Sequence, residues 1–220
     1  MTVESAQLLR LLQISDSALP IGAAAHSFGV ETLAAERLVD VGSLPAFLED
    51  YLAETGSMEA AFCRAAHSFA SAFVPEKWLR LNGRLSARKP ALESLAASLM
   101  LGRRFLELAC RLGDQPVLAA ALEGGAGHYS TAFGLVGGVL CFDEQVTVLA
   151  WLQQSLAGMI SACQRLMPLG QSQAARIQWD LKPALVRAAA ASGEETSCFM
   201  PLVELASMRH PALATRLFIS

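Results

Sequence analysis

Residues 92–111 of the chain are LESLAASLMLGRRFLELACR. Leucines recur in this segment at three-, four- and seven-residue steps, at Leu92, Leu95, Leu99 and Leu106. This spacing places them on one face of a helix. Charged residues lie four apart on another face, at Arg103, Glu107 and Arg111, where opposite charges can pair along the helix. The segment therefore predicts an amphipathic helix with its own surface ion pairs.

The same helical periodicity extends over nearly the whole chain. It recurs at Ala174, Ile177, Leu181, Leu185 and Ala188, where Pro183 is expected to kink or end the helix. Alternating runs rich in Val, Ile and Thr are essentially missing, so we expect almost no strand. Glycine and proline clusters divide the chain into about eight to ten helices. No break is long enough for a domain linker, and the sequence predicts one all-α, compact, bundle-like domain over residues 1–220.

Three glycines stand close together in the segment 133–140, at Gly134, Gly137 and Gly138. A helix with such gaps allows a neighbouring backbone to approach closely. A phosphate-binding loop would need a glycine followed by lysine, and no lysine in this chain is preceded by glycine. We therefore interpret the glycines as a core packing feature.

Composition points to a chain that must hide much apolar surface. Of its 220 residues 53% are hydrophobic and 17% are charged, so a large core or partner proteins must cover the excess. The formal net charge is −3. Since nucleic-acid binding needs clustered cations, we expect no nucleic-acid partner.

The sequence favours a cytoplasmic protein without a membrane span. Glu4, Gln7 and Arg10 interrupt the N-terminus, so we expect no secretion signal. Five cysteines without a CxxC pair are typical of buried thiols in a reducing compartment. Residues 145–164 carry no charge and are long enough to span a bilayer, but polar residues at their centre favour a buried core helix.

Recognisable catalytic motifs are missing from the sequence, which contains neither G-x-S-x-G nor H-E-x-x-H. Glu59, Cys63 and His67 follow four-residue steps, so they share one face of a helix. Sulfur and imidazole suit zinc or nickel, which makes these three residues weak metal candidates. A buried thiol beside a solvated carboxylate and imidazole is the simpler interpretation. A metal carrier that uses the three residues is the alternative function.

Two further segments allow both a structural and a binding role. In residues 19–31, LPIGAAAHSFGVE, His26 or Ser27 can satisfy main-chain groups beside Gly29. Alternatively, His26, Phe28 and Glu31 form a recognition surface. The tail RLFIS at residues 216–220 combines a cation with bulky apolar side chains, which suggests docking within the chain or onto a partner.

The segment RLMPLGQ at residues 165–171 predicts a junction between two helices. Pro168 disfavours helix at the residue before it, so Met167 is expected to end one helix. Gly170 permits a tight entry into the next helix, and Gln171 then lies near its N-terminus. The amide of Gln171 either caps main-chain groups or faces a partner.

Taken together, these ordered segments resemble the UreF family of urease accessory proteins. The matching segments are LLQISDSALPIG at 11–22, HSFGVE at 26–31, AFG at 132–134, RLMPLGQ at 165–171, His210, and RLF at 216–218 with Ser220. The resemblance implies an all-helical, non-enzymatic assembly factor. It also implies a homodimer that binds the accessory protein UreD, also called UreH, and with it recruits the GTPase UreG to apo-urease. In that setting the complex handles nickel, and this chain binds no cofactor stably.

The resemblance further implies where partners bind. In the family the N-terminal region and the C-terminal tail contact UreD, which corresponds here to a docking tail near residues 209–220. We therefore expect no catalytic residue and the following partner-binding residues: His26, Phe28, Glu31, Arg165, Pro168, Gly170, Gln171, His210, Arg216, Leu217, Phe218 and Ser220.

Overall fold

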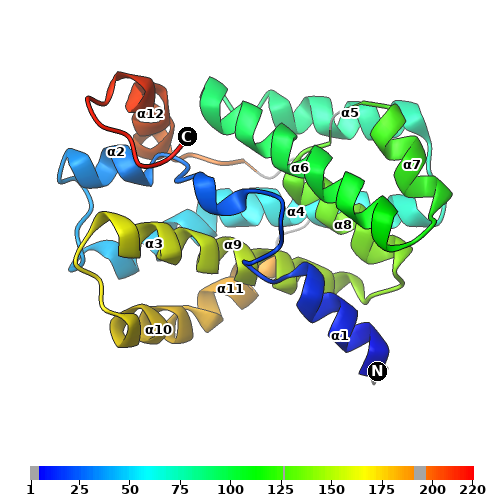
Figure 1. The fold of residues 1–220 in the computed structure, drawn as a ribbon, viewed down its shortest axis with the longest axis horizontal. Helices are drawn as coiled ribbons and strands as arrows, with labels where there is room; N and C mark the ends of the chain where they lie inside the picture. The colour runs from blue at the N-terminus through cyan, green and yellow to red at the C-terminus, as the bar shows by residue number, and fades with distance from the viewer. Residues whose placement is uncertain (1–4, 126, 191–196) are drawn as a thin grey trace.

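The computed structural model of the protein describes residues 5–125, 127–190 and 197–220, and within these ranges it contains helices and no strand. The helices are α1 (Ser5–Ile14), α2 (Val30–Ala35), α3 (Leu44–Tyr51), α4 (Ser57–His67), α5 (Pro75–Ser86), α6 (Leu92–Leu112), α7 (Pro116–Glu123), α8 (Tyr129–Val139), α9 (Glu144–Leu166), α10 (Gln171–Asp180), α11 (Lys182–Ala189) and α12 (Pro201–Arg209). The expectation of an all-α fold is confirmed (Figure 1).

The described residues form twelve α-helices, more than the eight to ten expected, and several of them are short. The periodic pattern of residues 174–188 is divided between α10 and α11, because helix geometry is interrupted at Leu181, two residues before Pro183. Conversely, α3 continues through a π-helical segment (Leu52–Gly56) directly into α4. Short apolar patterns in a sequence do not show where such breaks fall.

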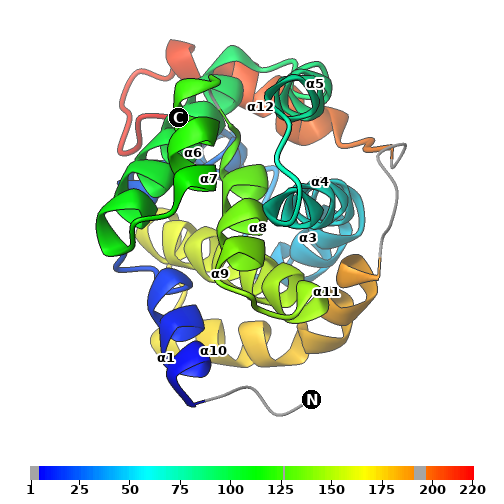
Figure 2. The same ribbon diagram turned by 90° about the vertical axis from the view of Figure 1, so that its right-hand side faces the viewer.

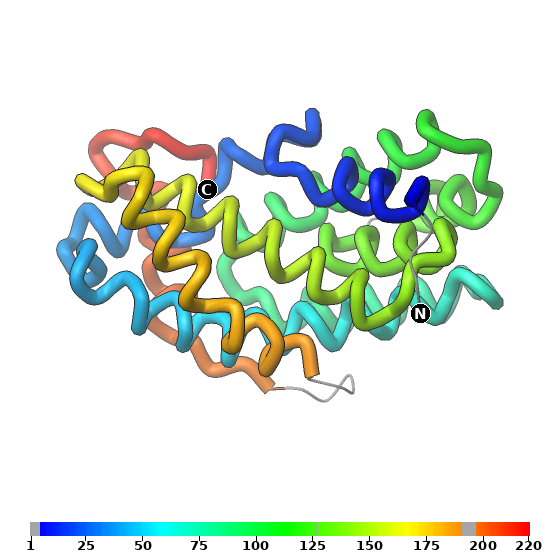
Figure 3. Tube along the Cα trace, turned by 90° about the horizontal axis from the view of Figure 1, so that it is seen from below, coloured from blue at the N-terminus to red at the C-terminus, as the bar shows by residue number. Residues whose placement is uncertain are grey.

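Helix α8 lies at the centre of the molecule, packed against α4, α6 and α9 (Figure 2). Helices α10 and α11 lie beside α9, and α12 packs on α2 and α6. Helix α1 is found toward one end of the molecule, whereas α12 and the C-terminal tail lie toward the other (Figures 1 and 3). Residues 15–29 connect these two ends.

Glycines allow α8 to approach its neighbours backbone to backbone. A Cβ atom built on Gly134 would lie 2.0 Å from the carbonyl oxygen of Cys63 in α4. One on Gly138 would lie 2.4 Å from the carbonyl oxygen of His67. On α6, Gly102 meets the segment that enters α8, where its Cβ would lie 2.1 Å from the carbonyl oxygen of Gly127. The interpretation of the glycine cluster as a packing feature is confirmed.

Helix α9 contains the uncharged residues 145–164, which were predicted to form a buried core helix. Its length and mean hydropathy would allow it to cross a bilayer, but 56% of its most apolar window is buried inside the protein. Trp151, Leu152, Leu156 and Ile160 form the buried side of the helix. This burial is the behaviour of a core helix.

The close approach at Gly134 generates a stability prediction. The substitution Gly134→Ala should destabilise the fold by about 2 kcal/mol, because the added methyl group overlaps main-chain atoms of α4 that cannot move independently. Gly83→Ala is the matched control, since in the described structure its Cβ meets no atom within 4 Å. In α5 that change should stabilise by about 0.5–1 kcal/mol. Denaturant unfolding of both variants measures the difference, and equal effects would contradict the packing argument.

Candidate functional site

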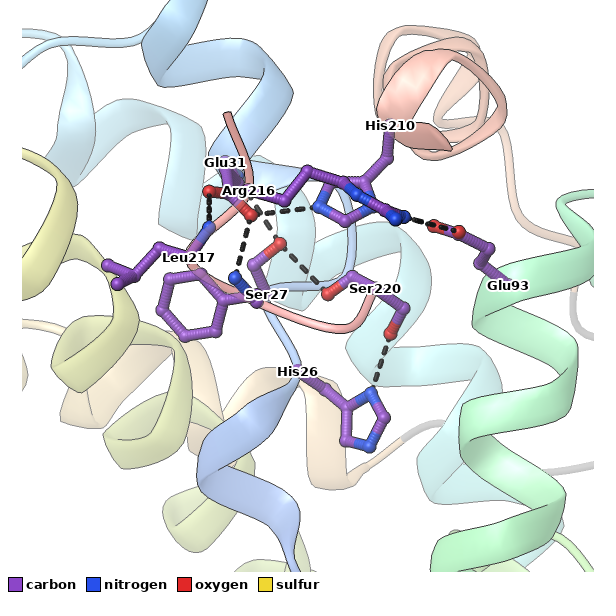
Figure 4. Close-up of polar contacts among 9 residues, drawn as sticks. His26, Ser27, Glu31, Glu93, His210, Arg216, Leu217 and Ser220 are labelled. Atoms are coloured by element: carbon purple, nitrogen blue, oxygen red, sulfur yellow. Dashed lines mark hydrogen bonds and ion pairs between the residues drawn. The ribbon is translucent and has the colours of Figure 1, made fainter. Parts of the chain in front are cut away.

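The C-terminal tail lies along the turn that precedes and begins α2. The main-chain N–H of Ile219 donates to the carbonyl oxygen of Ala25 at 2.8 Å. The main-chain oxygen of Ser220 accepts from the N–H and the hydroxyl of Ser27, at 2.5 and 3.0 Å (Figure 4). The tail is therefore bound within the chain by main-chain hydrogen bonds, and the structure supports the intrachain form of the docking prediction.

The turn that receives the tail has an unusual backbone. Gly29 adopts φ +89°, and Phe28 before it adopts φ +50°, which is rare for a bulky side chain. A side chain at residue 29 would also collide with α12, because its Cβ would lie 2.6 Å from Ser207 Oγ. The N–H of Phe28 donates to the main-chain oxygen of Ser220 at 3.3 Å. Docking of the tail thus helps to hold a backbone conformation that costs about 1 kcal/mol by itself.

Glu31 fixes the tail from the first turn of α2. Its side chain is 5% exposed, and its carboxylate accepts the main-chain N–H groups of Leu217 and Phe218 at 2.5 and 3.1 Å. Burial alone would raise the pKa of Glu31. The hydrogen bonds from Leu217, His210 and Phe218 outweigh burial, so the pKa of the carboxyl is lowered and the buried group is charged.

His210 joins Glu31 to a second carboxylate. The fully buried imidazole places Nε2 at 2.8 Å from Glu31 Oε2 and Nδ1 at 2.7 Å from Glu93 Oε2 (Figure 4). The two contacts make His210 a bridge between the two carboxylates. Arg216 lies 3.5 Å from the other oxygen of Glu93. One charged network therefore connects α2, the start of α6 and the tail.

His26 and Arg165 complete the contacts of the tail. His26 Nδ1 lies 2.7 Å from Ser220 Oγ. Burial, with the nearby cation Arg104, lowers the pKa of His26, so the ring is neutral at pH 7. The guanidinium of Arg165 stacks 4.2 Å above the ring of Phe218 and donates to the carbonyl oxygen of Ala24 at 2.8 Å. Arg165 thereby connects the end of α9 to both the tail and the turn.

The predicted partner-binding residues divide into two groups. The buried group consists of His26, Glu31, His210, Phe218 and Ser220, and Phe28 is half-buried beside them. Their side chains point into the protein and make contacts within the chain, and their role in partner binding stays a prediction. The exposed group consists of Arg165, Pro168, Gly170, Gln171, Arg216 and Leu217. For these residues partner binding remains a prediction.

The junction between α9 and α10 forms where the sequence placed it. Helix α9 ends at Leu166 with Met167 in an extended conformation, and α10 begins at Gln171 after Gly170. Pro168 and Met167 line a shallow groove with residues 39–42. The junction therefore presents Pro168, Gly170 and Gln171 at the surface, separately from the tail contacts.

The three metal candidates share a helix but not a site. Glu59 pairs with Lys89 and accepts from Ser130, while His67 Nε2 donates to the carbonyl oxygen of Phe142 at 3.0 Å. Burial raises the pKa of the Cys63 thiol, which disfavours the thiolate that a metal needs. Within the described ranges no three His, Cys, Asp or Glu side chains gather in a way that could hold a metal ion. The proposed ligand set is not brought together.

Sequence reasoning missed two residues that make long-range contacts. Glu93 lies in the segment that was expected to form an amphipathic helix, yet it is the second carboxylate on His210. Lys89, for which the sequence predicted no role, pairs with Glu59 outside this network. Both contacts join residues far apart in the chain, so the local spacing of residues does not predict them.

Comparison with known proteins identifies the family of the chain. A model of the UreF family matches residues 38–182. The chain belongs to the UreF family. Its relatives include the urease accessory protein UreF of Nostoc, 30% identical over 225 residues that cover 100% of this chain and 98% of the relative.

Two other UreF relatives also match over more than nine-tenths of both chains. The urease accessory protein UreF of Geobacillus kaustophilus is 32% identical over 97% of this chain and 98% of its own length. The one from Rhodopseudomonas palustris is 33% identical over 99% and 93%. The match to the Nostoc protein covers the whole chain, and it therefore includes the turn and the tail, which lie outside residues 38–182. The resemblance is therefore confirmed, and the chain is a urease accessory protein by family.

The charge on Glu31 should control seating of the tail. Glu31→Gln keeps the shape but removes charge-assisted hydrogen bonds, so we expect a loss of about 2 kcal/mol of stability and faster amide exchange at Leu217 and Phe218. Glu36→Gln is the control, because its exposed pair with Arg209 is worth less than about 1 kcal/mol. Unchanged tail exchange in Glu31→Gln would show that the carboxylate does not hold the tail.

Acidification should have the same effect as this substitution. The pKa of Glu31 in the folded chain lies below its ordinary value of 4.5, so the stability it provides is complete above that pH. That stability is lost as the pH falls through the folded-state pKa. The protection factor of the Leu217 amide, which removes the intrinsic pH dependence of exchange, should therefore fall from neutral to acid pH in the natural chain and be low at every pH in Glu31→Gln. Parallel pH profiles for the two proteins would contradict this assignment.

Proposed function

We propose that this chain is a non-enzymatic subunit of the assembly that inserts nickel into apo-urease. In this role it forms a homodimer in the cytoplasm, binds the accessory protein UreD (UreH), and with it recruits the GTPase UreG. Nickel is the cargo of the whole complex, and no stable metal site on this chain is required. Membership of the UreF family supports this role.

The observation that carries the proposal is the exposed apolar face of α1. Leu8, Leu9 and Leu12 are 46%, 66% and 58% exposed, although Leu11 and Ile14 on the same helix are buried in the core. Three neighbouring leucines in water form an apolar patch of the kind that partner proteins cover. Because the buried side anchors the helix, the exposed side is held in a fixed position.

The tail presents a second apolar surface, and here too the buried side chains hold the exposed ones in a fixed position. Its residues alternate, so that Leu217 and Ile219 are exposed while Phe218 and Ser220 are buried. The main-chain bonds to Glu31 and Ala25 fix the strand-like backbone, and the outward side chains are therefore pre-positioned. Pre-positioning lowers the entropy lost on binding, which favours a protein partner.

The junction between α9 and α10 supplies polar groups for recognition. Gln171 and Gly170 are exposed at the start of α10, and Arg165 is exposed above Phe218. An arginine beside apolar side chains is a frequent composition at the centre of protein interfaces. We assign these residues to the contact with UreD or UreG, next to the apolar surface of the tail.

The α1 surface provides the direct test. The double substitution Leu9→Ser and Leu12→Ser should weaken co-purification with UreD by more than about tenfold, since two exposed anchors are lost. The melting temperature should be nearly unchanged because neither side chain is buried. Leu92→Ser is the control, being 79% exposed at the start of α6. Equal UreD recovery by both proteins would remove α1 from the interface.

A further inference from the structure

A cavity of about 190 Å³ lies between residues 16–28, α9 and the inner ends of α6 and α8. Apolar side chains form much of its wall: Leu19, Ile21, Leu101, Trp151 and Met159. The rings of Tyr129 and Trp151 meet edge to face in this wall, with centroids 4.8 Å apart. The cavity is larger than an engineered protein cavity of about 150 Å³ that binds benzene, so its size suits a small organic molecule.

Two polar side chains that line the cavity each have an atom without a partner. His26 is 5% exposed, and its Nδ1 is bound by Ser220, whereas its Nε2 finds no partner among the described residues. Figure 4 shows this second nitrogen directed away from the tail. Gln154 accepts a hydrogen bond from Tyr129 Oη at 3.1 Å, and its buried amide nitrogen likewise lacks a partner in the described structure.

Unpaired buried groups of this kind are costly, at about 1–3 kcal/mol each. Either a polar ligand or ordered water must therefore complete the hydrogen bonds of His26 and Gln154 in solution. Water alone would leave the aromatic and aliphatic wall wetted, which opposes the hydrophobic effect. A molecule with an apolar body and one polar end satisfies both parts of the lining.

The charged side chains that line the cavity determine whether a charged or a neutral ligand can bind there. Lys89 in the lining is paired with Glu59, and the remaining charged lining residues, Arg165 and Asp16, have opposite signs. Arg165 is also engaged with Phe218 and with Ala24. The lining thus offers no surplus charge, and an ionised ligand would lose its hydration without a counter-ion.

We propose that this cavity is a binding site for a small neutral organic molecule that carries a hydroxyl or carbonyl oxygen on an aromatic or aliphatic body. The oxygen bonds to the amide of Gln154 and the free nitrogen of His26, and the body packs on Trp151 and Tyr129. The site lies on the inner side of the turn that holds the tail, where it shares His26 and Arg165 with the tail contacts. Its failure would leave the proposed role in urease assembly untouched.

Three probes of similar size test the chemical class on the full chain. Phenol is neutral with an oxygen, toluene lacks the oxygen, and benzoate is charged. Titration followed by the indole NMR signal of Trp151 should show phenol binding about tenfold more tightly than toluene, with benzoate weakest. Binding of no probe would mean that the cavity holds water only, and tighter binding of benzoate or toluene would overturn the assigned class.

Two matched pairs of variants locate the binding. Gly158 lines the cavity, and a Cβ there meets no described atom within 4 Å. Gly158→Trp should fill the cavity and weaken phenol binding by more than about tenfold, whereas Gly158→Ala should change it by less than about twofold. Equal phenol affinity in these two variants would place the bound probe elsewhere.

The second pair tests the polar anchor. Gln154→Leu should reduce phenol affinity to that of toluene while leaving toluene binding unchanged. Gln164→Leu is its control, because Gln164 also has a buried unpartnered amide nitrogen on α9 but does not line the cavity. Loss of phenol selectivity in both variants, or in neither, would overturn the assignment. Thermal unfolding of each variant shows that the compared proteins are folded.

Discussion

The structure depends on the contact between α4 and α8, where the missing side chains of Gly134 and Gly138 allow two backbones to touch. This approach brings Glu59 of α4 within hydrogen-bond reach of Ser130 at the start of α8, and the ion pair with Lys89 closes over them. Burial would raise the pKa of Glu59, but Lys89 and Ser130 outweigh it and lower the pKa, so a charged pair persists inside the core. The hydrogen bond from Ser130 to Glu59 joins the two helices, and the ion pair that holds the Glu59 carboxylate adds little net stability but is costly to break.

The charged network of the tail follows the same logic at the opposite end of the molecule from α1. His210 lies between Glu31 and Glu93. The N–H of Leu217 donates to the other oxygen of Glu31, and the N–H of Phe218 shares the oxygen that contacts His210. Each charge is bonded on several sides, which is the condition under which charged groups are tolerated in an apolar interior. The tail is thus part of the fold. Its order depends on electrostatics and not on the large apolar areas that hold the helices together.

The fold class and several local breaks could be predicted from sequence because they depend on neighbouring residues. Leucine spacing located α6, and Pro168 with Gly170 located the junction between α9 and α10. The contact between Glu31 and His210 could not be predicted, because the two residues are 179 positions apart in the chain. The spacing of charged residues along a sequence does not show which distant residues will pair. The same holds for Glu59 and Cys63, whose helical spacing is real but whose side chains meet Lys89 and the core instead of a metal.

Five of the twelve predicted partner-binding residues are buried, and their contacts position the exposed residues of the tail. The exposed side chains of Leu217 and Ile219 can be presented in one orientation only because Phe218 and Ser220, on the inner side, are held by Arg165 and His26. A partner that packs on the outer side would therefore lose less entropy on binding, because residues that it does not touch already hold the outer side chains in place. Since the inner contacts include the charge of Glu31, the affinity of the outer surface and the protonation of a buried carboxyl are thermodynamically linked. In such an arrangement a buried residue can matter for binding as much as an exposed one, by keeping the surface in its binding conformation.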